Sequence, residues 1–259
     1  MGAEHFVAIG SGKGGVGKST VSVNLAVALA QQGHRVGLID ADIYGPNVPL
    51  MFNLTRRQPE RVIDIAWNTG RGPKQWEPVE KYGVKIMSVG FLTGESQAIW
   101  NADLVQVLST QLVHRVEWGE LDYLLADLPP GSADINQRFV QSMNISGAII
   151  VVTPQDVSHL DAKKAIEMYQ HHGIKVLGAV ENMAGLACPH CDEVIDVFHR
   201  VDEDRSIWKT GVERLAQIPL DPEMSKSGDA GKPVVIGLPD SPQTAAFLQL
   251  AKTLTSLLA

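Results

Sequence analysis

The sequence is poor in cysteine, in aromatic residues and in long apolar runs. It contains 2 cysteines among 259 residues, and aromatic side chains make up 6% of the chain. Its apolar runs are shorter than the roughly 18 residues that a transmembrane helix needs, so we expect none. The first residues show no basic segment followed by an apolar core, so no signal peptide is expected. With so few thiols, a disulfide-stabilised extracellular domain is disfavoured, and the sequence indicates a cytoplasmic protein.

Basic residues are also in deficit. The chain has 22 Lys and Arg against 29 Asp and Glu, which gives a formal net charge of −7 at pH 7. A negative total argues against binding to bulk nucleic acid or to anionic membranes. The hydrophobic share of 44% and the length fit one globular domain of α/β size, residues 1–259.

Short apolar segments alternate with helix-length segments along the chain. The apolar segments are Phe6–Ile9, Val36–Ile39, Val84–Val89, Tyr123–Ala126, Ala148–Val152 and Val176–Val180. The helix-length segments are Val21–Gln32, Asp103–Glu117 and Ser158–His172. This alternation predicts a doubly wound α/β fold with a mainly parallel sheet and helices on both faces. Ligands of such sheets bind at the carboxyl ends of the strands.

A glycine-rich stretch separates the first apolar segment from the first helical one. It consists of Gly12, Lys13, Gly14, Gly15, Val16, Gly17, Lys18, Ser19 and Thr20. The pattern G-x-x-x-x-G-K-[ST] in this strand–loop–helix context is typical of a P-loop that binds the phosphates of ATP. The glycines let backbone N–H groups point inward, Lys18 faces the β- and γ-phosphates, and the Ser19 hydroxyl is a Mg²⁺ ligand. The alternative is a glycine-rich turn that only caps the helix.

Carboxylates follow two of the apolar segments. Asp40 and Asp42 come at the end of the second, where they can point toward one Mg²⁺–phosphate centre, Asp40 being nearer the water shell of the metal. Asp127 ends the fourth, as a Walker B aspartate that holds Mg²⁺ does. Each of these residues has an alternative role, because aspartate also caps turns.

A second lysine, Lys13, distinguishes this loop from the general pattern. The stretch resembles the deviant Walker A of the ATPase group that includes MinD, ParA and the nitrogenase iron protein. The resemblance implies that Lys13 reaches the nucleotide of a partner subunit in a homodimer. It also implies that Asp42 positions the attacking water, so that Lys13, Lys18 and Asp42 form the catalytic set. A solvated loop lysine is the alternative for Lys13.

An ordered set of further motifs extends the resemblance from residue 6 to about residue 255. It comprises Tyr44-Gly45-Pro46-Asn47, Asp127-Leu128-Pro129-Pro130-Gly131, Glu181-Asn182-Met183, Cys188-Pro189-His190-Cys191, Ile218-Pro219-Leu220-Asp221-Pro222-Glu223 and Gly228-Asp229-Ala230-Gly231-Lys232-Pro233. The set is similar to that of the Mrp/ApbC family of iron–sulfur cluster carrier ATPases, without the N-terminal domain that the family often has. Three segments depart from the family pattern, namely Trp100–Asp103, Gly131–Asp134 and Phe198–Asp204.

The family resemblance implies a function for the cysteines and a base-binding role for two other residues. Cys188 and Cys191 would hold a [4Fe–4S] cluster between the subunits of an ATP- and Mg²⁺-dependent homodimer, which passes the cluster to apo-proteins. Asn182 and Pro219 would lie near the nucleotide, although an asparagine there is equally consistent with a turn.

The cysteine pair leaves other functions open. An iron–sulfur or zinc site needs about four ligands, and the two thiolates of one chain supply half of them. A symmetric dimer would supply the rest. Zinc is compatible with the same thiolates. A thiol–disulfide oxidoreductase, or two unliganded thiols, are the remaining alternatives. His190 is a candidate ligand or simply an exposed side chain.

The C-terminal segment helps to distinguish a core helix from a membrane-binding or DNA-binding surface. Ser241 and Pro242 form a good helix start, and the apolar residues that follow recur at helical spacing. The segment carries one cation, Lys252, whereas a membrane anchor or a DNA-binding surface would want a basic face. We therefore predict a core-packed helix, without nucleic-acid or membrane binding.

A MinD- or ParA-like positioning ATPase without a cluster is the main alternative function. Residues 55–82 are predicted to form a surface loop.

Overall fold

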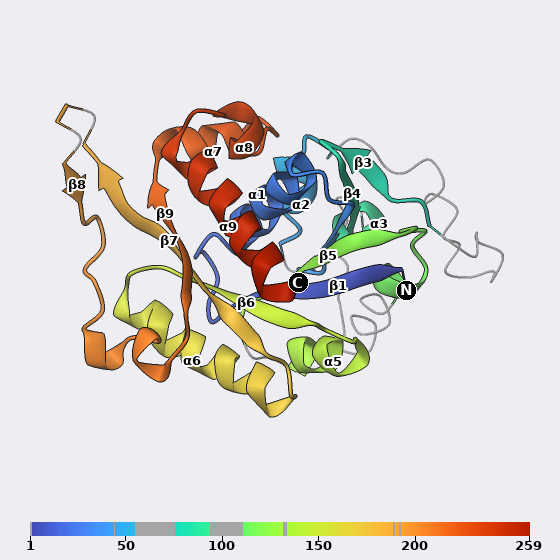
Figure 1. Ribbon diagram of the computed structural model, residues 1–259, viewed down its shortest axis with the longest axis horizontal. Helices are drawn as coiled ribbons and strands as arrows, with labels where there is room; N and C mark the ends of the chain where they lie inside the picture. Colours follow the sequence, from blue (N-terminus) through green and yellow to red (C-terminus); the bar gives the residue numbers. More distant parts are fainter. Residues whose placement is uncertain are drawn as a thin grey trace.

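A largely parallel sheet forms the centre of the computed structural model, which describes residues 2–43, 45–54, 76–93, 111–131, 134–188, 190–191 and 193–259 (Figure 1). The strand order is β3-β4-β2-β5-β1-β6-β7-β8, and β9 pairs with β7. The strands are β1 (Ala3–Ser11), β2 (Val36–Asp40), β3 (Val79–Lys81), β4 (Val84–Ser88), β5 (Leu121–Asp127), β6 (Gly147–Val152), β7 (Val176–Ala187), β8 (Val194–Ile195) and β9 (Arg214–Leu220). Only the pairs β3–β4 and β7–β8 are antiparallel among the described strands.

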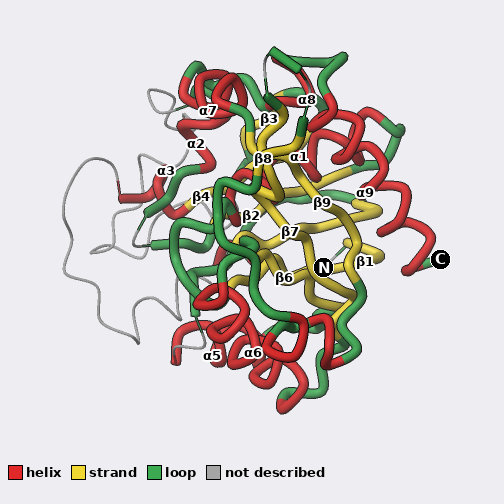
Figure 2. Tube along the Cα trace, turned by 90° about the vertical axis from the view of Figure 1, so that its left-hand side faces the viewer, coloured by secondary structure: helices red, strands yellow, loops and turns green. Residues whose placement is uncertain are grey.

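Helices cover both faces of this sheet (Figures 1 and 2). They are α1 (Lys18–Gln31), α2 (Val48–Met51), α3 (Val89–Thr93), α5 (Asp134–Ser142), α6 (Asp156–His171), α7 (Pro222–Asp229), α8 (Val234–Gly237) and α9 (Pro242–Leu258), with 3₁₀ turns η1 (Glu203–Arg205) and η2 (Trp208–Thr210). The α5 and α6 helices lie on one face, and α1 and α9 lie on the other. The predicted doubly wound α/β fold is confirmed.

The central strands are apolar because both of their faces are covered. Val7, Ala8 and Ile9 of β1 are fully buried, as are the residues of β6 from Ala148 to Val152. Continuous apolar strands of this kind are the mark of a buried parallel sheet. All six predicted strands are present, and so are the first and third predicted helices.

The structure differs from the predicted elements at two places, and parts of two predicted segments lie outside the described residues. Residues 79–81 of the predicted loop form β3, because Val84–Ser88 offers them an antiparallel edge. The apolar segment Val176–Val180 predicts only the first part of β7, which runs to Ala187 because β8 and β9 pair with its last part. Residues 55–75 of that loop, and residues 103–110 of the predicted helix 103–117, lie outside the described residues; residues 111–114 are helical.

The C-terminal helix packs into the core, as predicted. Ser241 caps it by accepting a hydrogen bond from the Thr244 N–H at 3.1 Å, and Pro242 occupies its first turn. Phe247, Leu250 and Leu254 are fully buried. Within the described parts of the chain, no helix combines the length and apolarity needed to cross a membrane.

The cap of α9 gives a direct test of this packing. We expect Ser241→Ala to lower the free energy of unfolding by about 1 kcal/mol, because it leaves a helix N–H without its side-chain acceptor. Urea unfolding followed by circular dichroism measures the change. Ser256→Ala, at an exposed position of the same helix, serves as the control and should stay within about 0.5 kcal/mol of the parent. Equal effects of the two substitutions would contradict the capping role.

Candidate functional site

The glycine-rich loop joins β1 to α1 at the carboxyl end of the central strand. Gly17 has φ +83°, a conformation that side-chain-bearing residues rarely adopt. A Cβ at this position would lie 2.1 Å from Asn182 Nδ2. A Cβ on Gly12 would lie 2.2 Å from the carbonyl carbon of Asp161 on α6. The loop is therefore pressed between β7 and α6, and glycine is required where it touches each of them.

A buried charge network lies directly beneath the loop. Lys18 Nζ is 2.8 Å from Asp127 Oδ1 and 3.5 Å from Asp42 Oδ2. The Ser19 hydroxyl donates to Asp127 Oδ2 at 2.6 Å. Burial alone would lower the pKa of Lys18, but the charges of Asp127 and Asp42 outweigh it and raise that pKa above its ordinary value. Lys18 is therefore a fixed positive charge in a site from which water is largely excluded.

Asp40 supports this network from behind. It pairs in register with Asp127 on the neighbouring strand and is fully buried. Its carboxylate accepts hydrogen bonds from Ser88 Oγ at 2.9 Å and from the backbone N–H groups of Asp42 and Val48 at 3.2 and 3.3 Å. Burial, together with the nearby charge of Asp127, raises the pKa of Asp40 to about 8. Its contacts order the start of α2, and its role in the water shell of a metal stays a prediction.

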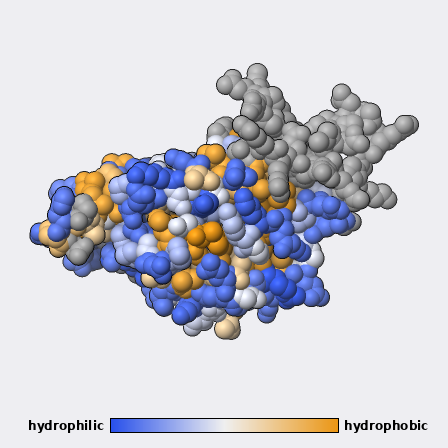
Figure 3. Space-filling view, turned by 90° about the horizontal axis from the view of Figure 1, so that it is seen from above, coloured by the Kyte–Doolittle hydropathy of each residue, from blue (hydrophilic) through white to orange (hydrophobic). Residues whose placement is uncertain are grey.

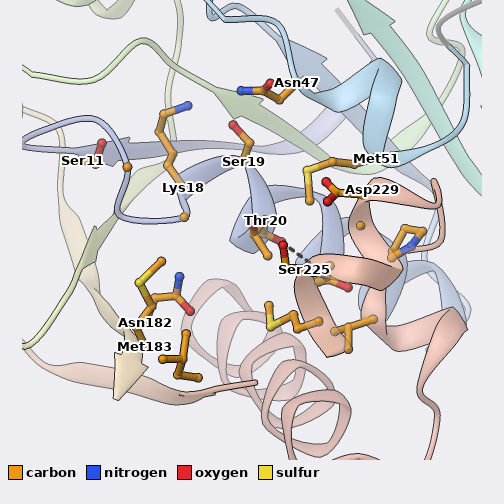
Figure 4. A pocket seen from close by; sticks show the side chains of 18 of the residues that line it. Ser11, Lys18, Ser19, Thr20, Asn47, Met51, Asn182, Met183, Ser225 and Asp229 are labelled. Atoms are coloured by element: carbon orange, nitrogen blue, oxygen red, sulfur yellow. Dashed lines mark hydrogen bonds between the residues drawn. The ribbon is translucent and has the colours of Figure 1, made fainter. Parts of the chain in front are cut away.

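A cavity of about 390 Å³ opens beside the loop (Figure 4). Its lining includes Ser11, Lys13, Gly14, Gly15, Gly17, Lys18, Ser19, Thr20, Asn24, Asp42, Asn47, Met51, Asn182, Met183, Pro219, Asp221, Met224, Ser225, Asp229 and Val234. In Figure 4, Lys18 and Ser19 stand at one end, and Met51 and Asp229 stand on the far side. The Lys18 end thus carries a positive charge, and the opposite side combines the apolar Met51 with the carboxylate of Asp229, a combination that suits a phosphorylated small molecule.

Asn182 and Pro219 lie in the cavity wall, where the family resemblance implies a base-binding role. Asn182 Nδ2 donates to the Val16 carbonyl at 2.9 Å, which ties β7 to the P-loop. The next residue, Met183, has φ +58°, and the pairing of β7 with β9 changes register between Asn182 and Leu186. Asn182 therefore sits at an irregularity inside a strand rather than in a terminal turn.

The α7 side of the cavity was missed by sequence reasoning. Met224, Ser225 and Asp229 of α7 line the cavity, as does Met51 of α2. The motifs around residues 218–223 and 228–233 were a signal that this region matters. Their spacing alone does not place α7 opposite α2, because that contact is made through the tertiary fold.

Lys13 lies at the rim of the cavity. Its Nζ is 3.4 Å from Gln155 Oε1, just before the start of α6. The side chain is half-buried rather than fully solvated. Lys13 thus lines the cavity of its own chain, and its contact with the nucleotide of a second copy stays a prediction.

The cysteines lie on a hairpin that projects from the sheet (Figure 1). Cys188 follows β7, and its N–H donates to the Glu193 carbonyl at 2.9 Å before the chain returns through β8. Cys188 is half-buried and Cys191 is exposed. Hydrogen bonds from the His190 N–H, and then from the Cys191 thiol and N–H, lower the pKa of Cys188 below its ordinary value. Both thiols are thus accessible, and the first is predisposed to act as a thiolate.

The hairpin also carries exposed apolar side chains. Val194 is 64% exposed, and Ile195 and Val197 are also well exposed. Apolar surface is visible at this end of the molecule in Figure 3. No cluster of three or more His, Cys, Asp or Glu residues suited to a metal occurs in the described ranges. Both cysteines of the sequence lie on this hairpin.

One of the segments that depart from the family pattern packs against α6. The Val201 N–H donates to the Pro154 carbonyl at 2.8 Å, and Arg205, directly after the segment, pairs with Asp156 at 2.6 Å. This segment therefore links the cysteine hairpin to the start of α6, close to Lys13 and the P-loop. Residues 100–103, and Ser132 and Ala133 of the other departing segments, lie outside the described residues.

Comparisons with known proteins agree with this site. Residues 2–255 match the model of a family described as NUBPL iron-transfer P-loop NTPase, of the ParA group. The iron–sulfur cluster carrier protein of Aquifex aeolicus is 42% identical over 263 residues, covering 99% of this chain and 68% of the relative.

Solved structures give the same fold. A nucleotide-binding protein from Archaeoglobus fulgidus in complex with ADP has a TM-score of 0.74 at 38% identity, covering 89% of this chain and 87% of that one. The cell division ATPase MinD of Pyrococcus furiosus has a TM-score of 0.73 at 23% identity, covering 99% and 100% of the two chains. The second likeness concerns the fold alone.

The close approach of Gly17 to Asn182 predicts a specific defect. We expect Gly17→Ala to weaken nucleotide binding at least roughly tenfold, because the new methyl group displaces Asn182 and strains the loop. Titration with a fluorescent ATP analogue measures the affinity. Gly33→Ala is the matched control, since Gly33 also has a positive φ of +90° but nothing lies within 4 Å of its added Cβ. That variant should lose about 1 kcal/mol of stability and keep its nucleotide affinity. Wild-type affinity in Gly17→Ala would contradict the assigned geometry.

Proposed function

The chain belongs to the family of NUBPL iron-transfer P-loop NTPases, and we propose that it is an ATP-hydrolysing carrier of iron–sulfur clusters. It holds a [4Fe–4S] cluster between two copies of itself and passes the cluster to apo-proteins. The observation that carries the proposal is the course of β7, which runs from Asn182 in the nucleotide cavity to Cys188 on the projecting hairpin. One strand thus connects the nucleotide site to the metal-binding thiols.

The chain's own groups at the charged end of the cavity suit ATP and Mg²⁺. Lys18 and the backbone N–H groups of the loop bind the phosphates. Ser19 Oγ and Asp127 Oδ2 bring a hydroxyl and a carboxylate oxygen within 2.6 Å of each other. Hard cations prefer such oxygen donors, so this pair fits Mg²⁺. When bound, Mg²⁺ supplies positive charge to the β- and γ-phosphates.

Hydrolysis rests on three side chains at that end. Asp42 orients a water molecule for in-line attack on the γ-phosphorus, and the bond to the β–γ bridging oxygen breaks to release ADP and phosphate. Lys18 turns from Asp127 to the developing negative charge. Lys13 of a second copy adds a further positive charge across the subunit contact.

The cluster is cargo that requires two copies of the chain. About four ligands complete an iron–sulfur cluster, and each copy contributes Cys188 and Cys191. Exposed Val194 and Ile195 flank the thiols and supply apolar contact surface for the second copy. Clients are apo-proteins that accept the cluster, rather than nucleic acids or membranes. Work in the cytoplasm would keep both thiols reduced.

A positioning ATPase without a cluster is less well supported. The likeness to MinD concerns the fold, whereas the relative that shares 42% of the sequence is named a cluster carrier. The chain also presents its two cysteines together on an exposed hairpin, which a positioning ATPase does not need.

Removal of the thiols tests the cargo. We expect Cys188→Ser/Cys191→Ser to bind no cluster after anaerobic reconstitution with iron and sulfide, because serine is a poor ligand for soft iron–sulfur centres. Visible absorbance and iron content measure the loss. His190→Ala keeps both thiols and should load as the parent does. A double variant that loads normally would refute the carrier function.

Replacement of the water-orienting carboxylate tests the reaction. We expect Asp42→Asn to lower turnover by roughly 10²- to 10⁴-fold while ATP affinity changes only a few-fold. Phosphate release and analogue binding measure the two quantities. Asp204→Asn removes an exposed carboxylate that does not line the cavity and should turn over normally. If Asp42→Asn hydrolyses ATP at the parent rate, another group positions the water.

A further inference from the structure

A buried hydroxyl outside the P-loop pattern also reaches the Walker B carboxylate. Ser22 lies on α1, one turn after Lys18, and is fully buried. Its Oγ is 2.8 Å from Asp127 Oδ1 and 3.1 Å from the Lys18 carbonyl. A hydroxyl has one proton to donate, and the ionised carboxylate is the closer and stronger acceptor. Ser22 is therefore a donor to Asp127.

Asp127 receives hydrogen bonds on both of its oxygens. Lys18 and Ser22 donate to Oδ1, and Ser19 donates to Oδ2. Asp127 has no exposed surface, so each donor replaces water that the carboxylate gave up on burial. A buried carboxylate that loses its donors is costly, because nothing else solvates its charge.

Two of these donors have other partners in the proposed function. Lys18 turns to the phosphates, whereas the Ser19 hydroxyl binds Mg²⁺ through an oxygen lone pair and keeps its proton for Asp127 Oδ2. Both side chains face the cavity (Figure 4). Among the described residues that line the cavity, Ser22 does not occur, and its place inside α1 keeps it beside Asp127. Ser22 is therefore the donor that stays on Asp127 Oδ1 when Lys18 turns away.

We propose that Ser22 is a positioning residue for the magnesium site. It would hold Asp127 Oδ1 in place after Lys18 has engaged the phosphates, and so keep the carboxylate oriented for a bound Mg²⁺. The inference rests on the proposed binding of ATP with Mg²⁺ and is independent of the cluster. It assigns a role to a residue three positions beyond Ser19, where the G-x-x-x-x-G-K-[ST] pattern places no requirement.

The test separates magnesium dependence from nucleotide affinity. Full-length Ser22→Ala is titrated with MgCl₂ in the presence of a fluorescent ATP analogue, and analogue affinity is also measured in EDTA. We expect the Mg²⁺ concentration for half-maximal binding to rise roughly tenfold, from the loss of one hydrogen bond to a charged group. The affinity in EDTA should stay within about twofold of the parent. Ser206→Ala, which removes another buried serine hydroxyl outside the nucleotide site, should change neither quantity.

The remaining outcomes would contradict either the role of Ser22 or the proposed binding of ATP. An unchanged Mg²⁺ requirement in Ser22→Ala would overturn the proposal, and so would an equal loss of affinity with and without Mg²⁺, which would indicate a general structural role. If Ser22→Ala does not fold, Ser22→Cys replaces it, because a thiol of similar size is only a weak hydrogen-bond donor. This variant should show the same rise in Mg²⁺ requirement. An unchanged requirement in Ser22→Cys would also overturn the proposal. Failure of the parent protein to bind the analogue under either condition would instead refute the proposed ATP binding.

Discussion

The buried ion pair between Lys18 and Asp127 is the interaction on which the site depends. Their 2.8 Å contact lies where Lys18 is 6% exposed and Asp127 is not exposed at all. A charge in such surroundings is stable only with a partner, and removal of one partner strands the other. Phosphate and Mg²⁺ are suitable replacements, because the first can take over Lys18 and the second can take over Asp127. In the proposed function, Lys18 and Asp127 therefore exchange each other for the phosphates and Mg²⁺ when the nucleotide binds.

The parallel sheet brings these groups together. Asp127 and Asp40 end adjacent strands in register, and β1 leads directly into the P-loop beside them. The same sheet extends the site outward, because β7 passes Asn182 at the loop and continues to Cys188. The proposed carrier thus has one continuous strand between its P-loop contact at Asn182 and its thiols.

The parts that sequence predicts are those with local causes. The P-loop, the Walker B strand and the cap at Ser241 each depend on a few consecutive residues, so their patterns were sufficient. The strand β9 was not predicted because it mixes polar residues and a proline, and it exists through its pairing with β7. The position of Asn182 inside β7, and the contact of Ser22 with Asp127, likewise arise from elements distant in sequence. The homodimer stays a prediction, which rests on the family resemblance and on the ligand count, since the sequence contains two thiols.

The most direct test of the carrier is the iron content of its dimer. Native mass spectrometry of the anaerobically reconstituted protein counts chains and iron atoms in the same particle. The account predicts a species of two chains that carries one cluster of about four irons, while Cys188→Ser/Cys191→Ser yields no iron-bearing species. Iron bound to single chains in the parent protein, or clusters in the double variant, would contradict a cluster shared through the two cysteine pairs.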